Sequence, residues 1–268
     1  MTQALIDQAI ALIKGQRFGE ALHLLRRAID KDPSQWNAWY MAGQCCRFLD
    51  DTDGAIRHLS RAAELKRDEP PIFLALGIAY QLKAQWDGAI DSFRRAIEID
   101  SDYELAYISL ALTQKKCGEL DKALHNYDAG AKALARRIVK AMQNSPTSPI
   151  HKHRDTVGTL WVEYATYAAL YLASSAEGIN SIAWPTGAQA LEEERTEKHA
   201  GLYWMDVPND KGETVRMFLP NYFNTFRELL KRDAAYSNLV GNRGTVLELL
   251  GRHDEARQHF DEAAEFQP

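Results

Sequence analysis

The sequence is poor in cysteine, and this scarcity sets the first limit on its fold class. Of its 268 residues only three are cysteine, and two of these, Cys45 and Cys46, are adjacent. Small secreted domains that depend on disulfides carry more cysteines, at spacings that allow them to pair. We therefore expect no disulfide framework, and we interpret the cysteines as small buried residues of a cytoplasmic protein.

Clusters of like charge and long apolar segments are also lacking. The chain has 32 Lys or Arg, 37 Asp or Glu and a net charge of −5, with no run of five or more like charges. Surfaces that bind nucleic acid or anionic membranes need basic clusters, so we expect neither partner. The most apolar stretch, residues 160–176, contains Glu163 and two serines and is too short to span a membrane. The N-terminus lacks the basic region and cleavage site of a signal peptide.

Motifs that carry catalysis are missing as well. The sequence contains no GxSxG, HExxH, Walker A or GxGxxG pattern, and its eight histidines are scattered. His151 and His153 could reach one metal ion, but no further ligand stands nearby at the usual spacing. We expect no catalytic residues, no metal site and no cofactor.

What the sequence does contain is a regular internal period. Three sets of small or apolar residues recur at one constant interval over four copies: Ala21, Ala55, Ala89 and Ala123; Leu25, Leu59, Phe93 and Tyr127; Ala28, Ala62, Ala96 and Gly130. Small residues let two helices cross closely while large ones fill the space on either side. The period therefore predicts pairs of short helices around tight turns.

The third copy, residues 70–101, has the clearest pattern. Its first half spaces residues as aromatic-x2-Leu-Gly-x2-Tyr, at Phe73, Leu76, Gly77 and Tyr80, and its second half as Ala-x3-Phe-x2-Ala, at Ala89, Phe93 and Ala96. This copy resembles the tetratricopeptide repeat, a helix–turn–helix unit with the same period. The resemblance implies an all-α, right-handed solenoid whose stacked units form a concave binding surface.

The register divides the chain into three parts. Four repeats predict an N-terminal array over residues 1–143, with its last helix extended to about residue 143. A Ser/Pro stretch at 145–149 ends the pattern. Residues 144–219 form an insertion, for which we expect an aromatic helix, a charged helix and a β-hairpin over 202–218. Helices of repeat type return at 220–268, where Ala256 falls three positions short of four whole periods after Ala123.

By the family pattern, five positions of the first helix in each repeat look into the concave groove. In the first repeat they include Ile6, Ile10 and Ile13, and in the second they include Phe48. In the next three we expect a partner-binding groove at Tyr40, Gln44, Arg47, Leu74, Ile78, Leu82, Leu105, Ile108, Leu112 and Lys116. The apolar anchors predicted to contribute most are Tyr40, Ile78, Leu82, Ile108 and Leu112.

These features favour a non-catalytic adaptor or scaffold that binds a protein or peptide in the groove. Some relatives clamp a C-terminal carboxylate with Lys and Asn, but the corresponding positions here hold Ile6, Ile10, Met41, Pro71 and Ala75, which supply no charge. Because the groove is so apolar, part of the chain itself or a small apolar ligand could also cover it.

Two further alternatives lie outside the groove. One is an enzyme or small-molecule sensor whose site is built by the insertion, around Trp161, Tyr164, Trp184 and Trp204. The other is self-association through the C-terminal helices, where we expect Phe260 and Phe266 to be only partly covered.

Overall fold

The computed structural model describes residues 2–144, 204–208, 214–218 and 234–265. The described helices are α1 (Thr2–Lys14), α2 (Phe18–Lys31), α3 (Trp36–Phe48), α4 (Thr52–Leu65), α5 (Pro70–Leu82), α6 (Trp86–Ile99), α7 (Glu104–Lys116), α8 (Leu120–Asn144), α13 (Ala234–Leu249) and α14 (His253–Glu265). The chain divides into two compact units, Met1–Asn126 and Tyr127–Pro268, and each is described by itself.

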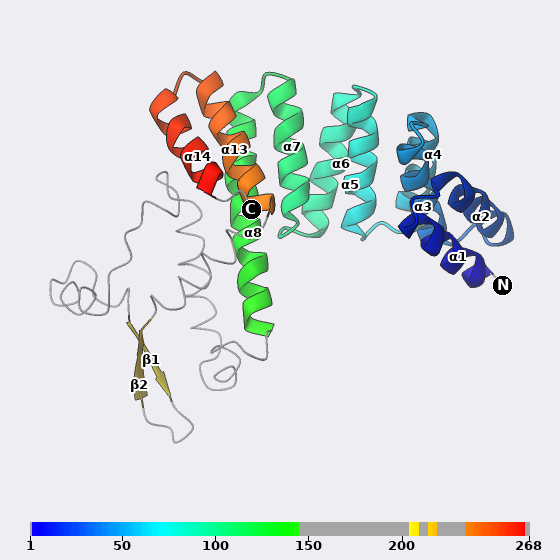
Figure 1. Ribbon diagram of the computed structural model, residues 1–268, viewed down its shortest axis with the longest axis horizontal. Helices are drawn as coiled ribbons and strands as arrows, with labels where there is room; N and C mark the ends of the chain where they lie inside the picture. Colours follow the sequence, from blue (N-terminus) through cyan, green and yellow to red (C-terminus); the bar gives the residue numbers. More distant parts are fainter. Residues whose placement is uncertain (1, 145–203, 209–213, 219–233, 266–268) are drawn as a thin grey trace. The chain divides into compact units, whose positions relative to one another are not determined.

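The first unit consists of helix pairs that follow the predicted period. Helices α1, α3, α5 and α7, the A helices, begin one period apart, and so do helices α2, α4, α6 and α8, the B helices. Figure 1 shows successive pairs of this unit side by side, and from α1 to α7 each helix packs against the next one in the chain. The all-α tetratricopeptide-type fold is thereby confirmed, as is the long last helix, which runs to Asn144.

Local chemistry explains where the helices begin. Pro70 occupies the first turn of α5, where its missing N–H is not needed. The Asp51 carboxylate caps α4 by accepting a hydrogen bond from the Gly54 amide at 2.8 Å. This bond satisfies one of the amide groups that the first turn of a helix leaves without a backbone partner.

The turn inside each repeat uses one residue in the left-handed backbone region. The residues are Gln16 (φ 56°), Asp50 (φ 57°), Ala84 (φ 55°) and Gly118 (φ 77°), again one period apart. Gly15 directly follows α1, yet it is the next residue, Gln16, that adopts positive φ. Only glycine takes this conformation without steric cost, so three of the four turns carry strain.

The core of each pair lies where a small residue of the A helix faces a large one of the B helix. A Cβ built on Gly77 would lie 2.4 Å from Phe93 Cε1, and one on Gly43 would lie 2.5 Å from Leu59 Cγ. Phe93 and Leu59 are completely buried. The predicted close crossing at Gly77 is therefore present, and the crossing leaves no space for a methyl group.

The second unit repeats this arrangement with α13 and α14, which pack against each other. Gly244 of α13 approaches Phe260 of α14 as Gly77 approaches Phe93, and Gly251 has the positive φ of the turn. Asp128 of α8 forms an ion pair with Arg243 of α13, with Oδ1 2.6 Å from Nε. Residues 220–233, which were predicted to belong to this part, lie outside the described residues.

Two short strands lie within the range predicted for a hairpin. They are β1 (Trp204–Pro208) and β2 (Thr214–Phe218), paired antiparallel with Asp206 opposite Arg216. The loop between them and the predicted helices of residues 145–203 lie outside the described residues.

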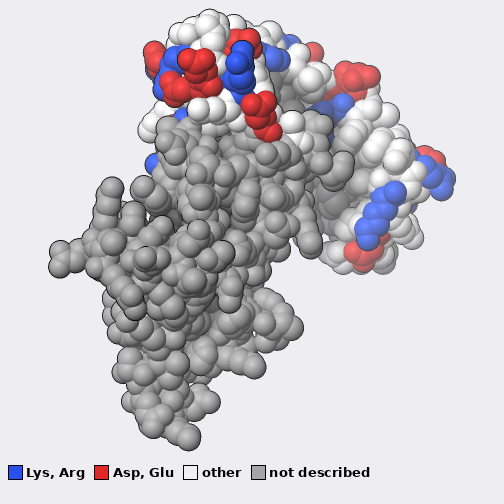
Figure 2. All heavy atoms as spheres, turned by 60° about the vertical axis from the view of Figure 1, so that its left-hand side comes forward, with Lys and Arg blue, Asp and Glu red and all other residues white. Residues whose placement is uncertain are grey.

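The charged surface is mixed in sign. Figure 2 shows basic and acidic side chains intermingled on the described part of the face that it draws. Many form exposed pairs one helical turn apart, such as Arg61 with Glu64 and Arg252 with Glu255. Pairs of this kind contribute little to stability. None of the helices in the described ranges has the length and apolar character needed to cross a bilayer.

Candidate functional site

The predicted groove residues of the second repeat form a hydrogen-bonded row along α3. Gln44 Nε2 donates to the Tyr40 hydroxyl at 3.1 Å, and Arg47 Nε donates to Gln44 Oε1 at 3.1 Å. They are half-buried and lie three or four positions apart on one face of the helix. The structure thus brings together Tyr40, Gln44 and Arg47.

Exposed apolar side chains stand at predicted groove positions. Phe48 is 52% exposed, Leu82 61%, Leu105 43% and Ile10 37%. Phe48 and Leu82 occupy the same place in successive repeats, the last residue of an A helix. The Phe48 ring stacks on Phe18 at a centroid distance of 4.4 Å, so the ring is fixed in place although half of it faces solvent.

Other predicted groove residues belong to the packing of the helices. Ile108 is only 9% exposed and Ile6 only 1%, so these two side chains offer little surface to a partner. Leu74 and Ile78 are half-buried and pack against the cluster around Phe93. These positions face the neighbouring repeat, because in a solenoid the same helix surface lines the groove and contacts the adjacent unit.

Helices α5 and α7 are joined by polar contacts at this surface. Gln81 Nε2 donates to Thr113 Oγ1 at 2.5 Å and to the Ser109 carbonyl at 3.2 Å. Of the remaining predicted residues, Leu112 is half-buried and Lys116 is exposed, with its ammonium 5.7 Å from the centre of the Trp86 ring. Burial and the neighbouring Lys116 lower the pKa of Lys115. The second effect arises because both lysines lie in the last turn of α7.

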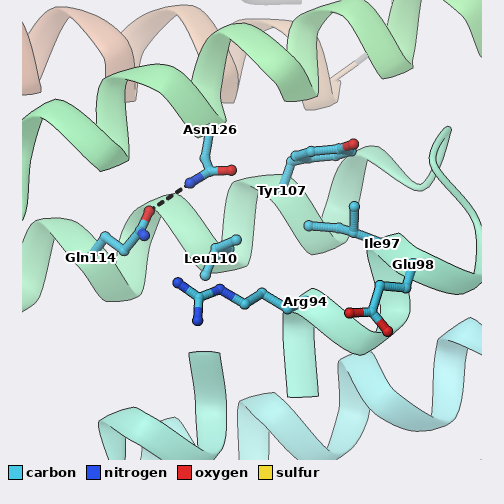
Figure 3. Close-up of a pocket in the computed structure, with 7 residues that line it drawn as sticks. All are labelled: Arg94, Ile97, Glu98, Tyr107, Leu110, Gln114 and Asn126. Atoms are coloured by element: carbon cyan, nitrogen blue, oxygen red, sulfur yellow. Dashed lines mark hydrogen bonds between the residues drawn. The ribbon is translucent and has the colours of Figure 1, made fainter. Parts of the chain in front are cut away.

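A pocket of about 260 Å³ lies elsewhere in the first unit, between α6, α7 and α8. Figure 3 shows its lining: Arg94, Ile97 and Glu98 from α6, Tyr107, Leu110 and Gln114 from α7, and Asn126 from α8. None of the predicted groove residues lines it. Sequence reasoning missed the pocket, although one signal was available, because Gln114 occupies the place of the signature tyrosine, Tyr80 in the preceding repeat.

Cys45 and Cys46 are not activated as nucleophiles. Burial raises the pKa of Cys45 to about 11, and that of Cys46 also to about 11. Cys117 differs from the expectation of a buried or half-buried thiol, because it is exposed. Within the described ranges, no group of three or more His, Cys, Asp or Glu is placed to hold a metal ion.

Comparison with known sequences identifies the repeats. Two family models, each described as tetratricopeptide repeat, match the chain, one over residues 6–70 and 224–268 and the other over residues 72–105. The chain therefore carries tetratricopeptide repeats, as the resemblance predicted. No curated protein matches it significantly.

Several solved structures are similar to the chain. "Crystal structure of MamA protein" is 20% identical with a TM-score of 0.48, over 75% of this chain and 95% of that one. "MamA RS-1 ArsTM double mutant" is 16% identical with a TM-score of 0.48, over 54% and 78%. "First TPR of Spaghetti (RPAP3) bound to HSP90 peptide SRMEEVD" is 16% identical with a TM-score of 0.43, over 44% and 93%.

Proposed function

We propose that this protein is a non-catalytic scaffold that binds a segment of a partner protein on the surface formed by its A helices. The observation that carries the proposal is the set of exposed apolar side chains at groove positions, above all Phe48 and Leu82. Apolar groups that recur at one repeat position over neighbouring units favour a bound segment, because a solenoid presents an extended surface.

The two kinds of side chain on this surface have different tasks. Phe48 and Leu82 are the anchors, since burying an exposed large apolar side chain contributes about 1.5–3 kcal/mol. The row of Tyr40, Gln44 and Arg47 offers hydroxyl, amide and guanidinium groups beside them. Such groups can pair with the backbone of an extended segment and fix its register. Ile108 is not among the anchors because it is buried.

The experiment compares the double variant Phe48→Lys/Leu82→Lys with a matched control, Leu49→Lys. Leu49 is 45% exposed and adjoins the site, but it lies outside the five groove positions. Proteins retained by each variant from a lysate of the native host are compared by quantitative mass spectrometry, and candidates are then titrated as purified proteins by calorimetry.

The proposal expects a purified partner that binds wild type and Leu49→Lys equally and binds the double variant at least tenfold more weakly. All the changed side chains are exposed, so circular dichroism should show unaltered helix content. A folded double variant that keeps every partner of the wild type would refute the proposal.

A second candidate function is self-association through α13 and α14. Phe260 is 36% exposed, whereas its equivalents Leu25, Leu59 and Phe93 are fully buried. Leu249, at the repeat position of Phe48 and Leu82, is 60% exposed. Light scattering at increasing concentration tests this proposal, which requires an oligomer that Leu249→Lys dissociates; a monomer at all concentrations would contradict it. The alternative of a site around Trp161, Tyr164 and Trp184 lies outside the described residues.

A further inference from the structure

The pocket between α6, α7 and α8 is independent of the groove and has a defined chemical character. Ile97 and Leu110 give it apolar walls, while Arg94 and Glu98 are exposed side chains of α6. Gln114, which is only 2% exposed, contributes a buried amide. Sites for drug-sized ligands or cofactors are usually larger, about 300–1,000 Å³, so this pocket suits a single side chain.

Comparison of the repeats shows what the fourth one lacks. In the third repeat Tyr80 stands at the position of Gln114, and its ring lies 3.2 Å from where a Cβ on Gly88 would be. The fourth repeat has the shorter Gln114 at this position and therefore no aromatic ring there.

The second repeat also lacks the tyrosine, since Cys46 replaces it, but it contains a pair of neighbouring rings. Trp39 and His58 lie with their ring centroids 5.5 Å apart. Their equivalents in the fourth repeat are Tyr107 and Asn126, both of which line the pocket. The fourth repeat has thus lost both the tyrosine and the Trp–His pair.

The hydrogen bonding of Gln114 is incomplete. Its Oε1 accepts from Asn126 Nδ2 at 2.7 Å, as Figure 3 shows. Its Nε2 donates to no other group in the described part of the chain. This nitrogen is not among the fully buried side-chain atoms that lack a partner, so solvent reaches it and an incoming acceptor could take the place of water there.

We propose that this pocket binds the side chain of a tyrosine from a partner protein. The ring packs between Ile97 and Leu110, and the phenol oxygen accepts a hydrogen bond from Gln114 Nε2. Tyrosine fits both demands, because it combines a large apolar ring with a polar tip. It is also the residue that this fold itself places at the equivalent position, Tyr80.

The test uses the full chain and three probes: p-cresol, toluene and the capped tripeptide acetyl-Ala-Tyr-Ala-amide. Binding is followed by NMR through the side-chain amide signals of Gln114 and Asn126, assigned by substitution. Gln114→Tyr fills the pocket from within, using the residue of the third repeat. Gln114→Leu keeps the approximate volume but removes the donor. Lys116→Tyr, an exposed change on the same helix, is the matched control.

The proposal expects saturable binding of p-cresol and of the tripeptide to wild type and to Lys116→Tyr. Gln114→Tyr should abolish this binding. Gln114→Leu should lower the affinity for p-cresol by about two- to tenfold, which is the effect of one hydrogen bond. The affinity for toluene should not change. Circular dichroism establishes that each variant is folded, and Gln114→Leu decides the matter if Gln114→Tyr does not fold.

Three results would overturn the proposal. The first is no saturable shift of either amide with p-cresol in wild type. The second is p-cresol binding that persists unchanged in folded Gln114→Tyr or Gln114→Leu. The third is binding of p-cresol without the tripeptide, which would assign the pocket to a small free phenol instead of a protein side chain. None of these results depends on the groove surface at Phe48 and Leu82.

Discussion

Replacing Gly77 by alanine tests whether the helix pairs are as closely packed as the structure indicates. Two effects oppose each other. Alanine is a better helix former than glycine by about 1 kcal/mol, which favours the variant. The new methyl group, however, would lie 2.4, 2.7 and 2.8 Å from Cε1, Cδ1 and Cζ of Phe93. Normal contact requires about 3.5–4.0 Å, so the ring must move by roughly 1 Å.

The steric effect should prevail, because Phe93 has no space into which to move. Its ring is completely buried and belongs to a cluster with Ala89 and Leu110. Inserting a methyl group into a well-packed core costs about 1–3 kcal/mol. Ala9 and Ala111 occupy the equivalent place in other repeats, so the fold accepts alanine where the pair is spaced for it. After the helix-propensity gain is subtracted, we expect Gly77→Ala to lower the free energy of unfolding by up to about 2 kcal/mol.

Gly19→Ala is the matched control. Gly19 also lies in a helix, but a Cβ there would meet nothing within 4 Å. Because Gly19 lies in the first turn of α2, this change should stabilise the protein by less than the roughly 1 kcal/mol expected in a helix interior. Guanidinium unfolding followed by circular dichroism gives both values, provided that the denaturant dependence m is the same for all variants.

A double-mutant cycle with Phe93→Leu tests whether contact with the Phe93 ring causes the destabilisation by Gly77→Ala. Leucine lacks two of the three ring atoms that the new methyl group would approach, Cε1 and Cζ. The cost of Gly77→Ala should therefore fall by about 1 kcal/mol in the Phe93→Leu background. If Gly77→Ala stabilises the protein as much as Gly19→Ala does, or if the two changes are additive, the reasoning from close packing is refuted.

Four other substitutions test local features. Ala84→Gly should stabilise the protein by about 1 kcal/mol because Ala84 has a φ of 55°, whereas Gly118→Ala should destabilise it by a similar amount; thermal unfolding with no such contrast would contradict the strain argument. Tyr127→Phe should be neutral or stabilise by about 1 kcal/mol, since the buried Tyr127 hydroxyl has no hydrogen-bond partner among the described residues, and a loss of stability in urea would reveal a partner. Burial, followed by Arg26 and Arg57, lowers the pKa of His58 below its ordinary 6.5, so the unfolded chain binds the proton more tightly. The contribution of neutral His58 to the free energy of unfolding is therefore complete above pH 6.5 and is lost as the pH falls through the lowered pKa. His58→Gln should flatten the pH dependence of the free energy of unfolding. An unchanged pH dependence would show that another group is responsible.

The helical part of the fold could be predicted because its information is local and periodic. The regular recurrence of Ala21, Ala55, Ala89 and Ala123 identified the repeat before any contact was known. Pro70 also marked a helix start through chemistry that acts within one turn. Small residues at a crossing and prolines at a helix start have the same effect in any context.

The exposure of individual groove residues could not be predicted from spacing. Leu105 and Ile108 lie one helical turn apart on α7, yet Leu105 is 43% exposed and Ile108 is buried. The difference depends on how closely the preceding repeat packs, and that depends on side chains distant in sequence, such as Gln81, which bonds to Ser109 and Thr113. The same limit applies to the pocket, which needs three helices to form.

The ion pair between Asp128 and Arg243 has a consequence for the order in which the protein folds. It joins positions 115 apart in sequence, whereas the contact from Gln81 to Ser109 closes a loop of only 28. Because the entropy lost on closing a loop grows with the logarithm of its length, closing the longer loop costs about 1.2 kcal/mol more free energy. Contacts of high sequence separation also form late. During synthesis, therefore, α1 to α7 can assemble by short-range steps, while the face of α8 that bears Asp128 waits until α13 has been made.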